Sequence, residues 1–303
     1  MATLYTHQAA NIRKTWFLMT VFLLVVIAVG WAVSWYYDSP VLLVGAVVFA
    51  VAMNVFSYWN SDTIVLKMTR AKAADPAQYP DLHNMVENLA ITAGLPKPRV
   101  YIVDDPAPNA FATGRDPQHG VVAVTTGLLG ILERNELEGV LAHELSHIGN
   151  RDILVSTVAV VLAGFLAVLS DLFLRSLMYG GGNRKNGGAL FLVLALVGAI
   201  LAPIAASLIQ LAISRKREFL ADASGALLTR YPEGLASALM KISQHGREMK
   251  RPSNATAHLF IANPFGPHKG IGQKLNHLFA THPPVEARVQ ALMGNRGRAS
   301  GNG

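Results

Sequence analysis

The segment His143-Glu144-Leu145-Ser146-His147 holds the residues of this chain that are best suited to metal chemistry. Two histidines four positions apart lie on the same face of a helix, so their imidazoles can bind one Zn²⁺ ion. Glu144, between them, is placed to deprotonate a water activated by that ion. Apolar residues recur around the segment at helical spacing, and Gly149-Asn150 is typical of a helix end. The pattern predicts a metal-binding helix that also carries a general base.

A catalytic zinc site uses three protein ligands and keeps one position open, so a third ligand is needed. The chain has no cysteine, and the best candidate is Glu218. Glu218 and Asp222 are four positions apart on a predicted helix, so both carboxylates point the same way. One carboxylate can ligate the metal while the other accepts a hydrogen bond from a ligand histidine. The alternative is that Glu218 pairs with Arg215 or Arg217 on a solvated helix face.

Four motifs of this chain resemble, in the same order, those of the HtpX-type membrane zinc metalloproteases, which are related to the CaaX prenyl-protein zinc proteases. They are Asn109-Ala110-Phe111-Ala112, the His143–His147 segment, Arg217-Glu218-Phe219-x-x-Asp222 and Thr281-His282-Pro283-Pro284. The resemblance covers nearly the whole chain and shows no departure at the metal-binding positions. It implies an α+β fold: a membrane-anchored, gluzincin-like zinc protease domain with two transmembrane helical hairpins.

The composition independently indicates membrane segments. Hydrophobic residues make up 51% of the chain and charged residues only 15%, which is too apolar for an ordinary soluble domain. Residues 16–37 and 39–61 carry no charge, and each stretch can cross about 30 Å of hydrocarbon as a helix. Asp38-Ser39-Pro40 predicts a tight turn, so the two stretches form a hairpin. A cleaved signal peptide is the alternative interpretation of the first stretch.

A second apolar pair follows the histidine segment. Residues 153–174 are interrupted only by Asp171, residues 189–213 carry no charge, and a glycine-rich linker joins them. Basic residues near this linker oppose the positive-inside trend, so a re-entrant or cytoplasmic-side arrangement remains an alternative to full crossing. If His147 and Glu218 bind one ion, the chain between them crosses the membrane twice or not at all.

Positive charge flanks the first hairpin and predicts its orientation. Both ends are expected on the cytoplasmic side, because Lys and Arg concentrate there: Arg13, Lys14, Lys67, Arg70 and Lys72. The net charge of +7 suits contact with the anionic lipid bilayer. No nucleic acid is expected as a partner, since the basic residues flank membrane segments and form no stripe interleaved with aromatic residues.

The rest of the chain predicts one α+β unit built from two soluble pieces. The expected segments are an N-terminal transmembrane hairpin (1–61), the first part of the protease domain (62–152), a second membrane hairpin (153–213), the second part of the protease domain (214–293) and a disordered tail (294–303). The predicted strands and helices are a helix ending at Gly94, strands 99–103, 109–113 and 120–126, helices 216–228 and 233–249, and a final helix from Pro284.

The hypothesis is peptide-bond hydrolysis without a covalent intermediate. His143, His147 and Glu218 hold the zinc, and Glu144 takes a proton from the attacking water and later delivers it to the leaving amine. Asp222 orients a ligand imidazole.

Two further roles are implied only by the resemblance. His282 would donate a hydrogen bond to the developing oxyanion, and Asn109, Ala110, Phe111 and Ala112 would form the edge strand to which substrate adds. Without the family, His282 could equally be a helix-entry residue, and the strand an ordinary turn-flanking one. Arg288 is expected in a surface salt bridge, with a role in steadying the site as the alternative. The remaining histidines are expected to be surface or structural residues: His119, His245, His258, His268 and His277.

The resemblance implies an integral-membrane zinc endopeptidase of a bacterial inner membrane, with its active site facing the cytoplasm. Its protein substrates would be unfolded or damaged membrane proteins, as part of quality control. A processing protease for lipidated (prenylated) peptides is the alternative enzyme, and a non-catalytic membrane scaffold or transporter is the alternative from another class. The sequence does not determine the oligomeric state.

Overall fold

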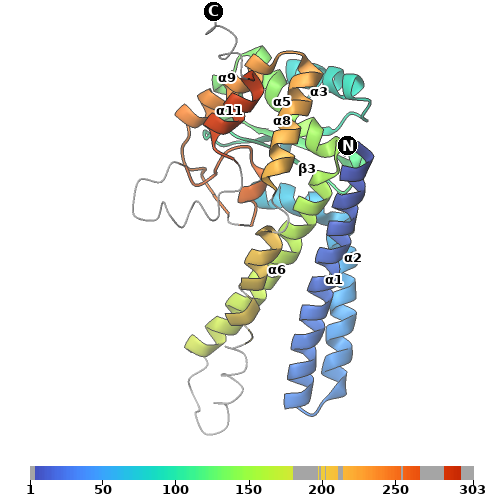
Figure 1. Ribbon diagram of the computed structural model, residues 1–303. Coiled ribbons are helices and arrows are strands. Elements are labelled where there is room, and N and C mark those ends of the chain that lie inside the picture. The colour runs from blue at the N-terminus through green and yellow to red at the C-terminus, as the bar shows by residue number, and fades with distance from the viewer. Residues whose placement is uncertain are drawn as a thin grey trace, which may run out of the picture.

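Two long antiparallel helices, α1 (Leu4–Tyr36) and α2 (Pro40–Thr69), extend from one side of the protein in the computed structural model (Figure 1). The structure describes residues 4–179, 197, 199–201, 203–210, 214–253, 255–266 and 283–294. The turn between the helices contains Asp38 in the left-handed conformation (φ 48°) and Pro40 in the first turn of α2. The predicted first hairpin is confirmed, although both helices are longer than the apolar stretches because their polar ends pack against the rest of the protein.

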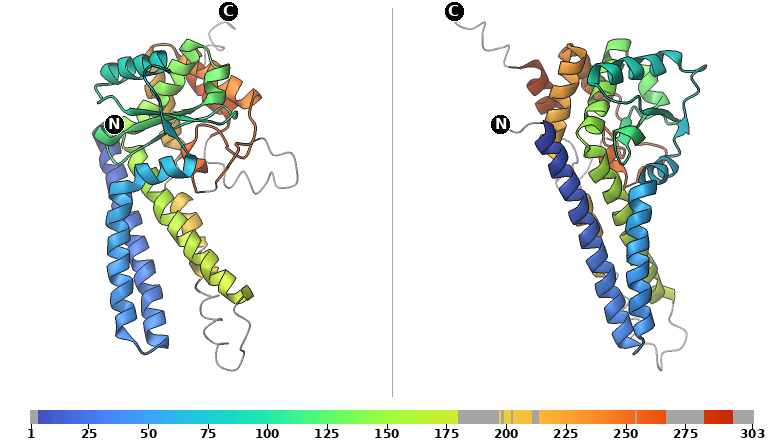
Figure 2. Two further views of the ribbon diagram at one scale, coloured as in Figure 1. Left: turned by 180° about the vertical axis from the view of Figure 1, so that it is seen from behind. Right: turned by 90° about the vertical axis from the view of Figure 1, so that its right-hand side faces the viewer.

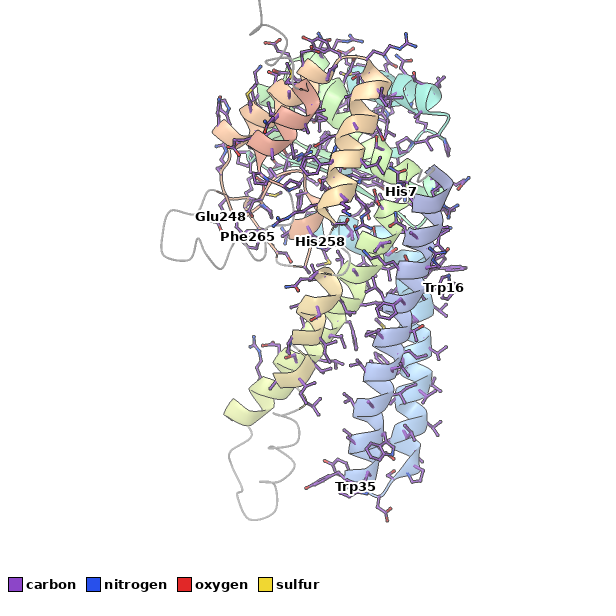
Figure 3. All side chains as sticks on the ribbon, viewed as in Figure 1. His7, Trp16, Trp35, Glu248, His258 and Phe265 are labelled. Carbon is purple, nitrogen blue, oxygen red and sulfur yellow. The ribbon has the colours of Figure 1, made fainter. Side chains whose placement is uncertain are left out.

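Within the described residues, four helical stretches are long and apolar enough to cross a membrane: His7–Tyr36, Pro40–Thr69, Asp152–Asp171 and Ala199–Thr229. The third belongs to α6 (Asp152–Tyr179), which packs on α1 and α2 and then diverges from them (Figures 1 and 2). Trp16 and Trp35 mark opposite ends of the apolar part of α1 (Figure 3) and are 61% and 76% exposed. The linker of the second hairpin and the predicted tail after Gly294 lie outside the described residues.

A four-stranded sheet with strand order β1-β2-β4-β3 lies in the part of the protein beyond the helical hairpin. Strands β2 and β4 are parallel, and the other two pairings are antiparallel, which leaves β3 at one edge. The strands are β1 (Lys72–Ala73), β2 (Arg99–Val103), β3 (Ala110–Thr113) and β4 (Val121–Thr125). All residues of β4 are buried, as its continuous apolar sequence requires. The three predicted strands are confirmed, to within one residue at each end.

Helices cover this sheet and complete the α+β fold predicted for the chain. They are α3 (Pro80–Ala93), α4 (Thr126–Ile131), α5 (Arg134–Gly149), α8 (Arg215–Thr229), α9 (Pro232–Gln244) and α11 (Val285–Met293), with two short 3₁₀ turns, η1 (Pro117–His119) and η2 (Ala257–Leu259). Gly94 ends α3 with φ 65°, as predicted. Helix α9 ends at Gln244, earlier than the predicted residue 249, because the chain turns so that Met249 bonds the Pro264 carbonyl.

Helix α5 lies between the sheet and helices α8 and α9 (Figure 1). Its start is closed by a capping box in which Glu133 and Glu136 bond each other's backbone. Gly225 of α8 lies against the α5 backbone, and an added Cβ there would lie 3.0 Å from the His143 nitrogen. This close approach sets α8 beside the histidines of α5. The fourth apolar stretch was defined by length and composition alone, and it includes α8. In the structure, α8 packs with α5 and α9 in the domain that contains the sheet (Figure 1).

Candidate metal centre

Helices α5 and α8 bring His143, His147 and Glu218 together at one point. The two Nε2 atoms are 3.2 Å apart, and the Glu218 carboxylate lies 3.6 Å from Nε2 of His147 and 3.9 Å from Nε2 of His143. These residues form a group whose ligand atoms all lie within 4.8 Å of one another, so they could hold one metal ion. Arg217 bonds elsewhere, to Asn11 and Asp152.

Each imidazole presents its Nδ1 atom to a carboxylate on its far side. Nδ1 of His143 lies 3.0 Å from Oδ1 of Asp222, a close polar contact that is not aligned as a hydrogen bond. Nδ1 of His147 lies 3.0 Å from Oδ2 of Asp152. A proton on each Nδ1 leaves the two Nε2 lone pairs pointing toward Glu218. Asp222 therefore lies where the sequence analysis expected it.

Asp152 is a site residue that the sequence analysis missed. It follows His147 beyond the end of α5, and Arg151 between the helices takes the left-handed conformation with φ 57°. Helical spacing does not apply across such a turn, so no periodicity places Asp152 near His147. The visible signal was only a carboxylate a few residues after the second histidine.

The charges around this group suit a cation. Burial lowers the pKa of His143. Burial acts in the same direction on His147, but its hydrogen bond to Asp152 and the nearby Glu218 carboxylate outweigh it and raise the pKa of His147 to about 9. The cluster thus stabilises a positive charge among three electron-pair donors, and a divalent metal ion fits that donor set.

Glu144 lies on α5 beside the metal-binding group and is 2% exposed. Burial raises its pKa to about 7, with a further increase from Glu218 that the charge of His147 opposes. The backbone N–H of Ala112 on β3 lies near the carboxylate and acts weakly in the opposite direction, lowering the pKa. A carboxyl group with this pKa can both accept and deliver a proton near neutral pH.

The prediction that Arg288 forms a surface salt bridge is wrong. It is 1% exposed and donates two hydrogen bonds to Asp222, from Nε at 2.8 Å and from Nη2 at 2.6 Å. The reason is that α11 packs onto α8 and α9, which encloses the guanidinium. Burial alone would raise the pKa of Asp222, but the bonds from Arg288 and the contact with His143 hold it at about 2.

The predicted substrate strand is present as β3, at the edge of the sheet, and all four of its residues are buried. Its outer edge is partly paired with the chain itself. The Ile261 N–H donates to the Ala110 carbonyl at 2.9 Å, and the Phe111 and Phe260 rings lie 5.1 Å apart. The Asn109 amide bonds both backbone groups of Ala262, at 2.9 and 3.0 Å. A substrate strand would have to replace this pairing.

A cavity of about 40 Å³ connects these residues; its lining includes Ala112, His143, Glu144, His147, Glu218 and His258. His258, expected to be a surface or structural residue, is 8% exposed and comes from η2 (Figure 3). No ligand spacing in the sequence predicts this placement, because a loop carries it to the site. His119 bonds Asp116 and His245 is exposed, as expected. His282, His268 and His277 lie outside the described residues.

Comparisons with known proteins agree with this geometry. The family model described as Peptidase family M48 matches residues 76–296. A protein named Protease HtpX homolog from Caldanaerobacter subterraneus subsp. tengcongensis is 48% identical over 297 residues, which cover 96% of this chain and 97% of that protein. One of the same name from Pyrococcus furiosus is 53% identical over 251 residues, which cover 82% of this chain and 84% of that protein.

The crystal structure of S. mikatae Ste24p has a similar fold, with a TM-score of 0.51 and 19% sequence identity. The match covers 91% of this chain and 62% of that one. The resemblance to HtpX-type proteases is thus confirmed, and the four apolar helices agree with a multi-pass membrane protein. The family match, the relatives that align over most of the chain and the clustered side chains that could hold a metal ion lead to one conclusion: this chain belongs to peptidase family M48 and is a membrane metalloprotease.

Proposed function

We propose that the chain is a zinc endopeptidase of a bacterial inner membrane that cleaves unfolded or damaged membrane proteins on the cytoplasmic side. The observation that carries this proposal is the convergence of His143, His147 and Glu218 beside Glu144. Two ligands at about 2.05 Å from one tetrahedral zinc ion lie about 3.3 Å apart. The 3.2 Å between the two histidine Nε2 atoms agrees with that value.

The side chains of the site have separate roles in this proposal. When bound, zinc would lower the pKa of water toward about 7 and polarise the scissile carbonyl. Glu144 takes the proton from the attacking water and delivers it to the leaving amine, for which its raised pKa is suited. Asp222 and Asp152 hold the imidazoles of His143 and His147 in the tautomer that binds metal.

The proposal includes two further roles. We assign oxyanion stabilisation to His282, which precedes the buried Pro283 and the start of α11. Arg288 of α11 donates to Asp222, so this helix packs against the metal centre. We assign substrate binding to β3, because Ala112 of this strand lines the same cavity as Glu144 and an edge strand can bind an extended peptide.

The orientation follows from charge and from the position of the protease domain. The basic residues that flank the first hairpin lie at the end of α1 and α2 that meets this domain: Arg13, Lys14, Lys67, Arg70 and Lys72. The turn at Asp38 lies at the opposite end (Figure 1). Because cytoplasmic flanks are the positively charged ones, the protease domain faces the cytoplasm. A site at the base of membrane helices suits substrates that emerge from the bilayer.

The decisive experiment replaces the proposed general base. Glu144→Gln in the purified chain in detergent should lower cleavage of an unfolded casein-like substrate by about 10²–10⁴-fold, with zinc still bound. Glu138→Gln is the matched control: Glu138 lies on the same helix in a salt bridge with Arg134 and should leave the rate unchanged. Full activity of Glu144→Gln would overturn the mechanism.

Metal and substrate are tested separately. Chelation should abolish cleavage and added zinc should restore it, whereas activity after complete metal removal would contradict a zinc enzyme. A prenylated peptide assayed beside the unfolded protein distinguishes the substrate classes. Cleavage of the prenylated peptide alone would replace the quality-control role with the processing of lipidated peptides.

A further inference from the structure

The first helix of the protein reaches the metal centre through one buried amide. Asn11 on α1 is 5% exposed, and its Nδ2 donates to Oδ1 of Asp152 at 2.7 Å and to the Asn150 carbonyl at 2.9 Å. Its Oδ1 accepts a hydrogen bond from Nη1 of Arg217 at 3.0 Å. The nitrogen and the oxygen of this amide therefore both bond residues close to the proposed ligands: at the end of α5, at the start of α6 and in α8.

Two partners of Asn11, Asp152 and Arg217, lie next to proposed metal ligands. Asp152 accepts from Nδ1 of His147 through its other oxygen, at 3.0 Å. Arg217 directly precedes Glu218 on α8 and also lies 3.4 Å from Asp152. Asp152 is 4% exposed and the side chain of Arg217 is 13% exposed, so both charged groups are largely enclosed. In such a low-dielectric setting, hydrogen bonds hold a charged group in a defined orientation.

A second bond ties the same turn of α1 to the end of α5. Nε2 of Gln8 donates to the Gly149 carbonyl at 2.7 Å, so α1 binds the carbonyls at the C-terminal end of the metal-binding helix. Among the described residues, no hydrogen bond joins Gln8 to Asp152. Gln8 therefore contributes to the docking of α1 on α5 but not to the orientation of His147. Asn11 serves both purposes.

We propose that Asn11 is a positioning residue for the metal centre, which makes metal affinity depend on the N-terminal membrane hairpin. Its amide fixes the Asp152 carboxylate against His147 and steadies Arg217 next to Glu218. Loss of the amide leaves Asp152 free to rotate toward Arg217 alone, which releases the His147 ring. This inference rests on the proposed metal site and adds to it a residue from outside the soluble domain.

The test measures zinc binding directly rather than proteolysis. Asn11→Ala is made in the full chain carrying Glu144→Gln, which prevents self-cleavage, and the zinc Kd is determined by competition with a chromophoric chelator. Loss of an outer partner of a metal ligand should weaken zinc binding about tenfold. The visible spectrum of the cobalt(II)-loaded protein should change as well, because it reports ligand geometry.

Asn54→Ala is the matched control. Asn54 is also a buried asparagine of the first hairpin, 8% exposed, and it bonds the Met19 carbonyl away from the site. This variant should change the zinc Kd by no more than about twofold even if it lowers stability. In an Asp152→Ala background, Asn11→Ala should weaken zinc binding less than it does in the parent, because the contact with Asp152 is already lost and only the bond from Arg217 remains.

The outcomes separate this inference from the proposed function. If the parent chain binds no zinc, both fail. If the parent binds zinc and Asn11→Ala or Asn11→Asp binds it equally tightly, only the role of Asn11 is overturned. Asn11→Asp keeps the side-chain volume and the acceptor for Arg217 but places an oxygen against Asp152. It gives a decisive result where Asn11→Ala fails to fold.

Discussion

Arg288 on α11 and Asp222 on α8 form a buried two-point salt bridge, with bonds of 2.6 and 2.8 Å. Each side chain is only 1–2% exposed. Asp222 also faces Nδ1 of His143, so the bridge links the last described helix to the back of the metal centre. An arrangement of this kind orients a ligand imidazole and at the same time holds two helices together.

Removal of the cation from this bridge should destabilise the fold strongly. Arg288→Ala leaves a buried carboxylate unpaired, which costs about 3–5 kcal/mol and lowers the midpoint of thermal unfolding in detergent by about 6–20 °C. Arg134→Ala, which breaks the exposed bridge to Glu138, should change stability by less than about 1 kcal/mol. Equal shifts in the two variants would show that burial of the Arg288 bridge has no energetic consequence.

Acid should remove the stability that Asp222 contributes. Its pKa falls from 3.8 to about 2 on folding, so the contribution is fully present above about pH 4 and disappears as the pH falls toward 2. The shift corresponds to a free energy on the order of 2 kcal/mol. Unfolding of the metal-free protein is measured against pH.

The Asp222→Asn variant should show a shallower pH dependence in this range than the parent. Asp104→Asn is the control, because Asp104 is 82% exposed, and its curve should follow that of the parent. An unchanged slope in Asp222→Asn would rule out this carboxylate as the source of the acid sensitivity.

Zinc affinity should increase with pH. A histidine ligand must lose its proton to bind metal, and the pKa of His147 is about 9. Below that pH each unit of acidification should weaken the apparent affinity by about tenfold, measured by chelator competition between about pH 6 and pH 8. Asp152→Asn removes the negative charge that helps to raise this pKa and should flatten the dependence. A pH-independent affinity in the parent would contradict the proposed protonation state.

Opening the edge of β3 should promote cleavage. Ile261→Pro removes the N–H that donates to the Ala110 carbonyl, and a competing substrate strand would then meet less pairing to displace. We expect kcat/KM for an unfolded protein substrate to rise several-fold, mainly through a lower KM. Ile261→Ala is the control, since it truncates the same buried side chain but keeps the N–H. A Pro variant no more active than the Ala variant would speak against substrate addition at this edge.

Local sequence patterns were sufficient for the parts of the molecule that depend on short-range physics. Helical spacing placed His143 and His147 on one face of α5, and uncharged stretches with a turn at Asp38 predicted the first hairpin. Short runs of apolar and β-branched residues located the strands to within a residue. In each case the information lies within one or two turns of helix or one strand, so the neighbouring residues determine the outcome.

The residues around the ligands depended instead on how distant elements pack. Asp152, Arg288 and Asn11 come from α6, α11 and α1, and nothing in their local sequence distinguishes a buried partner from a surface charge. The pairing of Ile261 with β3 is likewise a contact between segments far apart in the chain. The sequence by itself predicted the candidate ligands, the candidate general base and the apolar helices. Only the tertiary structure decided which side chains hold them in place, because burial and partner choice arise when separate elements meet.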